Sequence, residues 1–243
     1  MLVDQPDSRH LVHFYGTDER HHVSSVQSYF ATGLAGGALG LAVARPEILQ
    51  ALATFGPDLI RLEAQATLDA FLTGGEPSWE LFDATVGAHV RLLSEAGRPI
   101  RAYGEMVGLL WTLGNRSAAL RLEQFWNRLQ RAYPVTLYCG YPLDIFETGF
   151  DIGAVDGIMC AHTRVVSSGS DGHVRRALDL AIDEVLGAQA ASLRPLIKPN
   201  FRPTWARIPR EEATTLWLRN NLPGAADEIM HRARELYAKR FAA

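Results

Sequence analysis

The side chains best suited to chemistry stand at the ends of apolar segments of the chain. Glu105, Cys139 and Tyr15 each end or follow such a segment, and His162 follows the apolar residues 158–160. The carboxyl ends of parallel strands meet at one edge of a sheet, where α/β folds place ligands. The sequence therefore predicts a ligand site at that edge. Its candidate residues are 15–20, 45–47, 104–105, 139–141 and 162.

Glu105 has two interpretations. It is a candidate ligand contact or general base at the sheet edge, because a carboxylate there can accept a proton. Equally, an acidic residue at the start of a helix stabilises the positive end of the helix dipole, and a helix is expected directly after Glu105. The sequence leaves both interpretations open.

The chain lacks the residues that a P-loop nucleotide site requires. The chain contains only the lysines Lys198 and Lys239, both beyond the expected sheet, and no GxxxxGK[ST] motif. The loop after the first strand instead carries Asp18 and Glu19, and negative charges repel phosphate. The sequence therefore does not predict an ATPase of this type.

Metal and thiol chemistry have weaker signals. His10, His13, His21 and His22 cluster near the first strand, but no HExxH or CxxC spacing occurs. His10 and His13 would point to opposite faces of a strand, because side chains alternate. We therefore expect no metal site, no cofactor and no catalytic set, although Cys139 near a histidine or carboxylate could act as a nucleophile. A buried structural role is the stronger interpretation of that cysteine.

The totals indicate a cytoplasmic protein without a membrane segment. The chain has 243 residues, 47% hydrophobic residues and a net charge of −3, which argues against nucleic-acid binding driven by overall charge. Its longest weakly polar run, 31–44, is too short to span a bilayer, and the N-terminus lacks the pattern of a signal peptide. Two cysteines do not make a disulfide framework.

Apolar runs alternate with amphipathic segments along the chain, which predicts an α/β fold with a mainly parallel sheet. Gly-Asn at 114–115 separates two helices, and Asn115 or Ser117 can cap the second. A proline-rich stretch, 193–210, precedes a helical hairpin broken at 223–224. Expected strands are 11–15, 38–44, 59–62, 100–103 and 135–139, and expected long helices are 23–34, 78–96, 118–129, 173–190, 211–220 and 225–241.

Several segments together resemble a known family. They are HLVHFYGTDE, GLAGGALGLAVA, RAYGEMVGLLW, LEQFWNRL, TLYCGYP and IMCAHTRVV. The chain resembles the MEDS family, the methanogen/methylotroph, DcmR-type sensory domain. RAYGEM and LEQFWNRL are the most specific of these segments, and the resemblance covers about residues 9–170.

The resemblance implies a three-layer, RecA/KaiC-like α/β domain over 9–170 that has lost its phosphate loop, followed by a helical extension over 171–243. It implies sensing of a small molecule, such as a hydrocarbon derivative, and signalling to a regulator of transcription. The chain has no kinase core and no convincing helix-turn-helix, so the extension would serve output or homodimerisation. The implied ligand-site residues are Tyr15, Asp18, Glu105, Glu123, Cys139, Tyr141 and His162.

Three functional hypotheses therefore remain. The first is a non-enzymatic sensor whose ligand biases the C-terminal helices and, through them, a regulatory partner. The second is a divergent nucleotide-binding or hydrolysing protein that uses Glu105 as a base. The third is a pure protein-interaction module with a vestigial ligand edge. None involves a membrane or direct binding to nucleic acid.

Overall fold

Six parallel strands form the central sheet, in the order β3-β2-β6-β7-β1-β8. The computed structural model describes residues 10–16, 19–144, 146–147, 152–167, 172–197 and 207–240. The strands of the sheet are β1 (His10–Phe14), β2 (Leu39–Ala44), β3 (Leu59–Glu63), β6 (Ile100–Gly104), β7 (Val135–Tyr141) and β8 (Arg164–Val166). A separate small hairpin pairs β4 (Leu72–Thr73) with β5 (Glu76–Pro77).

Continuous apolar sequence explains the inner strands. Every residue of β1 and β2 is buried, as expected for parallel strands covered on both faces. Two hydrophobic cores lie on the two faces of the sheet: Leu11 and Ala42 belong to one, Val12 and Leu41 to the other. The α/β prediction with three layers is confirmed.

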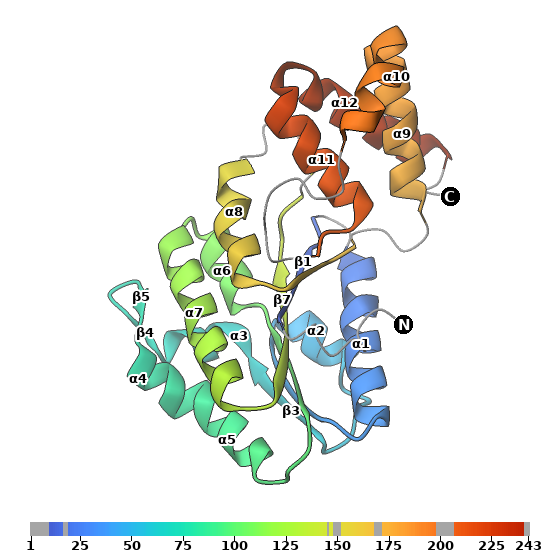
Figure 1. The fold of residues 1–243 in the computed structure, drawn as a ribbon. Helices are drawn as coiled ribbons and strands as arrows, with labels where there is room; N and C mark the ends of the chain where they lie inside the picture. Colours follow the sequence, from blue (N-terminus) through green and yellow to red (C-terminus); the bar gives the residue numbers. More distant parts are fainter. Residues whose placement is uncertain are drawn as a thin grey trace.

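Helices cover both faces of the sheet (Figure 1). The first face carries α1 (Glu19–Ala35) and α2 (Pro46–Ala51). The opposite face carries α3 (Ala64–Asp69), α4 (Trp79–Phe82), α5 (Ala88–Ser94), α6 (Met106–Thr112), α7 (Arg116–Ala132) and α8 (Ile152–Ala161). A π-helical turn, Asp83–Gly87, joins α4 to α5 into the single helical segment predicted over 78–96. Among the described residues, no helix combines the length and the hydropathy needed to cross a bilayer.

The C-terminal helices form a third core beyond the sheet. They are α9 (His173–Leu186), α10 (Ala190–Leu193), α11 (Arg210–Asn221) and α12 (Pro223–Arg240). The extension is nevertheless joined to the sheet. Leu216 of α11 belongs to the large core under the sheet, and Arg207 pairs with Arg164 of β8. The helical hairpin predicted over 211–241 is confirmed in α11 and α12.

Asn115 supplies the cap of α7, as its position predicts. Its side-chain oxygen accepts a hydrogen bond from the Ala118 N–H at 3.2 Å, and its amide donates to the Gly75 carbonyl at 2.6 Å. Replacing Asn115 by Ala is expected to lower the free energy of unfolding by about 1–2 kcal/mol. Urea unfolding followed by circular dichroism checks this value. Gln124→Ala, an exposed change on the same helix, is the control and should stay within about 0.5 kcal/mol of wild type.

Candidate functional site

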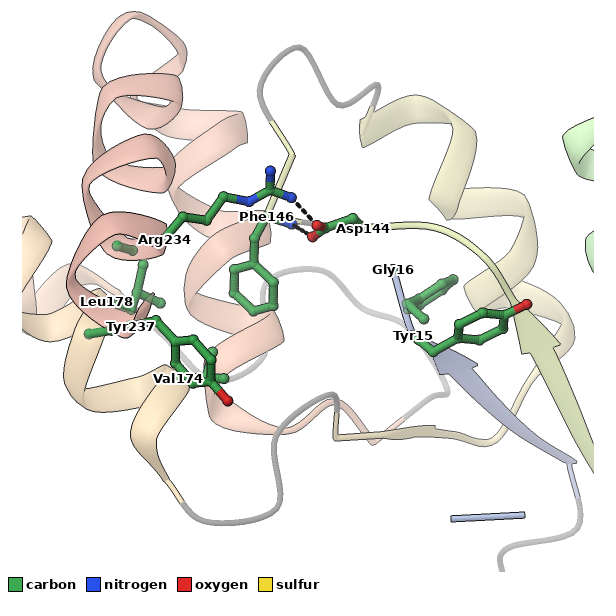
Figure 2. A pocket seen from close by; sticks show the side chains of 11 residues that line it. Tyr15, Gly16, Asp144, Phe146, Val174, Leu178, Arg234 and Tyr237 are labelled. Atoms are coloured by element: carbon green, nitrogen blue, oxygen red, sulfur yellow. Dashed lines mark hydrogen bonds and ion pairs between the residues drawn. The ribbon is translucent and has the colours of Figure 1, made fainter. Parts of the chain in front are cut away.

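A pocket lies at the carboxyl end of β1, between the sheet and the C-terminal helices (Figure 2). Its volume is about 330 Å³. The end of β1 and the segment after β7 form one side, and α9 and α12 form the other. Small-molecule sites in α/β folds commonly lie at this end of the strands. The lining residues are Phe14, Tyr15, Gly16, Asp144, Phe146, Val174, Ala177, Leu178, Ala233, Arg234 and Tyr237.

The turn after β1 positions the sheet side of this pocket. The N–H groups of Tyr15 and Gly16 donate to the carbonyls of Tyr141 and Leu143, each at 3.1 Å. Gly16 has a φ of +55°, and a Cβ there would lie 3.0 Å from the Cβ of Asp144. Glycine is therefore required at this turn both by the backbone conformation and by the close approach of Asp144.

An ion pair links the two sides of the pocket. The Arg234 guanidinium on α12 donates to the Asp144 carboxylate, whose other oxygen accepts from the Phe146 N–H at 2.8 Å (Figure 2). Most of the other lining side chains are apolar. The pocket can thus hold a small apolar molecule with a polar group directed at the Asp144–Arg234 pair.

Tyr15 connects this pocket to a cluster on the α1 face of the sheet that is buried except for the half-buried Arg45. It is here called the Glu105 cluster: His13, Tyr15, His22, Arg45, Tyr103, Glu105 and Tyr138. The Tyr15 ring stacks on the His22 ring, with centroids 3.8 Å apart and planes at 15°. His22 Nε2 lies 2.7 Å from the Tyr103 hydroxyl and 3.6 Å from Glu105 Oε1. A displacement of the Tyr15 ring would therefore act directly on His22, which is buried in the Glu105 cluster.

Glu105 is held by Arg45 rather than by its own helix. Its carboxylate accepts from the Arg45 backbone N–H at 2.8 Å and from Arg45 Nε at 3.2 Å, and it makes no capping bond to α6. Burial opposes ionisation of Glu105, but hydrogen bonds from His22 and Arg45 outweigh it and lower the pKa of the carboxyl. The carboxylate therefore stays ionised and engaged at neutral pH.

A second buried group, here called the Glu123 cluster, lies on the opposite face between the sheet and α7. It consists of His10, Glu123, Cys139, Tyr141 and His162. Glu123 Oε1 accepts from the Tyr141 hydroxyl at 2.7 Å, and Oε2 accepts from the Cys139 thiol at 3.6 Å. Burial, and to a lesser extent Glu123, raises the pKa of the thiol well above its ordinary value, so by itself it stays protonated.

The structure does not bring the predicted site residues to one edge. Tyr15 borders the pocket, and Glu105 does not, but it contacts His22, on which the Tyr15 ring stacks; Asp18 lies outside the described residues. The prediction for His162 is wrong in position, because 158–160 belong to helix α8 and not to a strand. His162 lies before β8, at the amino end of the sheet. The remaining three predicted residues, Glu123, Cys139 and Tyr141, join His162 in the Glu123 cluster.

Sequence reasoning missed the residues that complete each group. His10 and His22 carried a signal, since both belong to the histidine-rich N-terminal stretch, but their partners are distant in sequence. The pocket residues on α9 and α12 carried no such signal, because the sequence of these two segments indicates only amphipathic helices.

Comparison with known families decides the assignment. A family model described as the methanogen/methylotroph, DcmR sensory domain (MEDS) matches residues 9–163. The chain belongs to the MEDS family. Comparisons with curated proteins and with solved structures yield no match. MEDS is a sensory domain, so a sensory role of this chain is supported.

The pocket lies across the boundary of the region that the MEDS model matches. The MEDS match includes both buried clusters and ends before β8 and the helical extension. The pocket is therefore shared by two parts of the chain. The matched region contributes the carboxyl end of β1 and the segment after β7, whereas α9 and α12 lie beyond the match. A molecule in the pocket would touch both parts of the chain.

Proposed function

We propose that this chain is a non-enzymatic cytoplasmic sensor whose small-molecule ligand binds in the pocket between the MEDS domain and the C-terminal helices. The observation that carries the proposal is the shared lining, with Phe14 and Tyr15 on the sheet side and Leu178 and Tyr237 on the helix side. A ligand that contacts two parts of a chain alters their relative packing whenever it binds one arrangement better than another.

The chemistry of the lining favours an apolar ligand with one polar group. Phe14, Phe146 and Leu178 supply hydrophobic contacts, and a cavity of about 330 Å³ suits a small molecule. A hydrocarbon derivative with a hydroxyl or carboxylate group has this character. Its polar group would compete for the Asp144–Arg234 ion pair and thereby loosen α12 from the MEDS domain.

On this proposal, the C-terminal helices α9 and α12 transmit the signal. A shift of α9 and α12 would change the surface that the extension offers to a regulatory protein of transcription or to a second copy of the chain. The loop between β1 and α1 would, on this proposal, be a former phosphate loop that no longer binds nucleotide. Its helix begins with Glu19, which pairs with Arg45 at 3.2 Å.

The absence of catalysis is part of the proposal. Glu105, the strongest candidate base, accepts two hydrogen bonds from Arg45 and is 2% exposed. A base that is occupied and shielded in this way has no open position for substrate. Nucleotide hydrolysis that Glu105→Gln abolishes without loss of folding would favour the enzyme alternative instead.

A pocket-filling variant tests the sensor. Val174→Trp places an indole at the half-buried start of α9 and is expected to abolish at least about nine tenths of the melting-temperature shift given by small hydrocarbon alcohols and acids, because the cavity is filled. Leu196→Trp, on the exposed side of the extension, is the matched control and should keep the shift. An equal shift in both variants would place the ligand elsewhere.

A further inference from the structure

Four side chains of the Glu123 cluster carry atoms that can ligate a metal, and these atoms converge. One ligand atom each from His10, Glu123, Cys139 and His162 lies within 4.8 Å of the others. The four residues come from β1, α7, β7 and the turn after α8, and each is at most 1% exposed. Such convergence from four separate elements is not a consequence of neighbouring sequence.

Hydrogen bonds fix the tautomers of both histidines. His10 Nδ1 lies 3.0 Å from Asn127 Oδ1, and the Asn127 amide is oriented by its own donation to the Ala161 carbonyl at 3.3 Å. His162 Nδ1 donates to the Ile158 carbonyl at 2.6 Å. With Nδ1 as the donor, the neutral form of either imidazole directs the lone pair of its Nε2 inward.

The inward lone pairs face a carboxylate. His10 Nε2 lies 3.1 Å from Glu123 Oε2, and His162 Nε2 lies 3.4 Å from Glu123 Oε1. His162 Nε2 is fully buried and has no hydrogen-bond partner. Acceptors that face one another in a dry interior repel, and a cation between them removes the repulsion.

We propose that His10, Glu123, Cys139 and His162 bind a single Zn²⁺ ion in a closed, structural site. Two imidazoles, a thiolate and a carboxylate are the donors that zinc prefers. Bond lengths of zinc to these donors put tetrahedral ligand atoms about 3.3–3.7 Å apart. Four separations lie close to this range: His10 Nε2 is 3.1 Å from Glu123 Oε2 and 3.4 Å from Cys139 Sγ, Cys139 Sγ is 3.6 Å from Glu123 Oε2, and His162 Nε2 is 3.4 Å from Glu123 Oε1. All four ligand atoms lie within 4.8 Å of one another, so zinc would draw them together slightly.

The surroundings of the four residues also suit a metal. Ligating histidines usually donate their second N–H to a carbonyl or carboxylate, as His10 does to Asn127 and His162 to Ile158. The Tyr141 hydroxyl orients the Glu123 carboxylate. Zinc binding releases the thiol proton of Cys139, and the charges of Zn²⁺, thiolate and carboxylate then cancel, which favours complete burial.

The role of the ion would be structural. Four protein ligands would complete the tetrahedral coordination of the zinc ion, and the cluster is closed to solvent. No coordination position therefore remains for a substrate. The ion would fasten the turn between α8 and β8, through His162, to β1 and β7. It would thus fix the edge of the sheet against which the extension packs.

Metal content of the full-length chain tests the proposal. After incubation with excess Zn²⁺ and thorough desalting, mass spectrometry of the metals should find one zinc ion per chain. Cys139→Ser and Glu123→Gln should lower the content at least about tenfold. Cys160→Ser, which removes the exposed cysteine, is the matched control and should retain the ion. Less than about 0.1 zinc ion per wild-type chain, or equal content in Cys139→Ser, would overturn the proposal.

Co²⁺ provides a test that does not depend on the folding of a ligand variant. The wild-type chain refolded with Co²⁺ should show the thiolate-to-cobalt charge-transfer band and the intense visible bands of tetrahedral coordination, and so should Cys160→Ser. Asn127→Ala, which removes only the hydrogen bond to His10, should weaken binding about 10- to 100-fold. A wild-type spectrum of hexahydrated Co²⁺ would overturn the assignment.

Discussion

Trp126→Ala is expected to lower the free energy of unfolding by about 3–5 kcal/mol. Trp126 is fully buried on α7, and its ring meets Phe82 edge-on with centroids 5.4 Å apart. A Cβ placed on Gly104 would lie only 3.6 Å from the same ring, so the indole fills the space between α7, the α4–α5 segment and β6. Its N–H has no hydrogen-bond partner, so the loss comes from packing and the cavity left behind.

Urea unfolding followed by circular dichroism measures this loss. Leu113→Ala is the control, because Leu113 is 71% exposed at the end of α6 and its truncation should cost less than about 0.5 kcal/mol. A loss below about 1.5 kcal/mol for Trp126→Ala would mean that the neighbouring helices collapse onto the site, contrary to the packing described here.

His13 is expected to make folding weaken in mild acid. It is fully buried, with Nδ1 2.8 Å from the Tyr138 hydroxyl and 3.1 Å from His22 Nδ1, and its Nε2 has no hydrogen-bond partner. Burial first, then His22 and His21, hold the pKa of His13 well below its ordinary value. Between pH 7 and 5 the unfolded chain binds a proton that the folded chain does not. The free energy of unfolding therefore decreases as the pH is lowered, by up to about 2 kcal/mol from this residue.

The measurement is the free energy of unfolding in urea at pH 7, 6 and 5. His13→Gln should flatten the decline by up to about 2 kcal/mol, since its side chain does not titrate. Leu113→Ala serves as the control, because it changes an exposed side chain that carries no titratable group and should keep the wild-type pH slope. An unchanged slope in His13→Gln would show that His13 is protonated in the folded chain.

The sheet and its flanking helices could be predicted because each rests on local pattern. The apolar run at 38–44 gave β2, the pattern around Leu122 and Trp126 gave α7, and Asn115 caps that helix as expected. The alternation rule also held: His10 and His13 point to opposite faces and join different clusters. These features depend on residues close together in the chain.

The sites could not be predicted to the same extent because they depend on tertiary contacts. His10 meets Glu123 only after β1 has been inserted beside β7 and α7 has packed on the sheet. Residues 158–160 are apolar enough for a strand, and nothing local shows that tertiary packing makes them part of α8. The pocket needs α9 and α12, which no motif connects to β1.

The pairing of Arg207 with β8 has a consequence for association between copies. The Val165 N–H donates to the Arg207 carbonyl at 2.8 Å, and the Arg207 N–H donates to the Thr163 carbonyl at 2.9 Å. The chain thus covers part of its own open sheet edge, a device that prevents edge-to-edge aggregation in β-containing proteins. Truncation of the chain before Arg207 would remove this cover and leave the backbone groups of β8 as a template for strand addition.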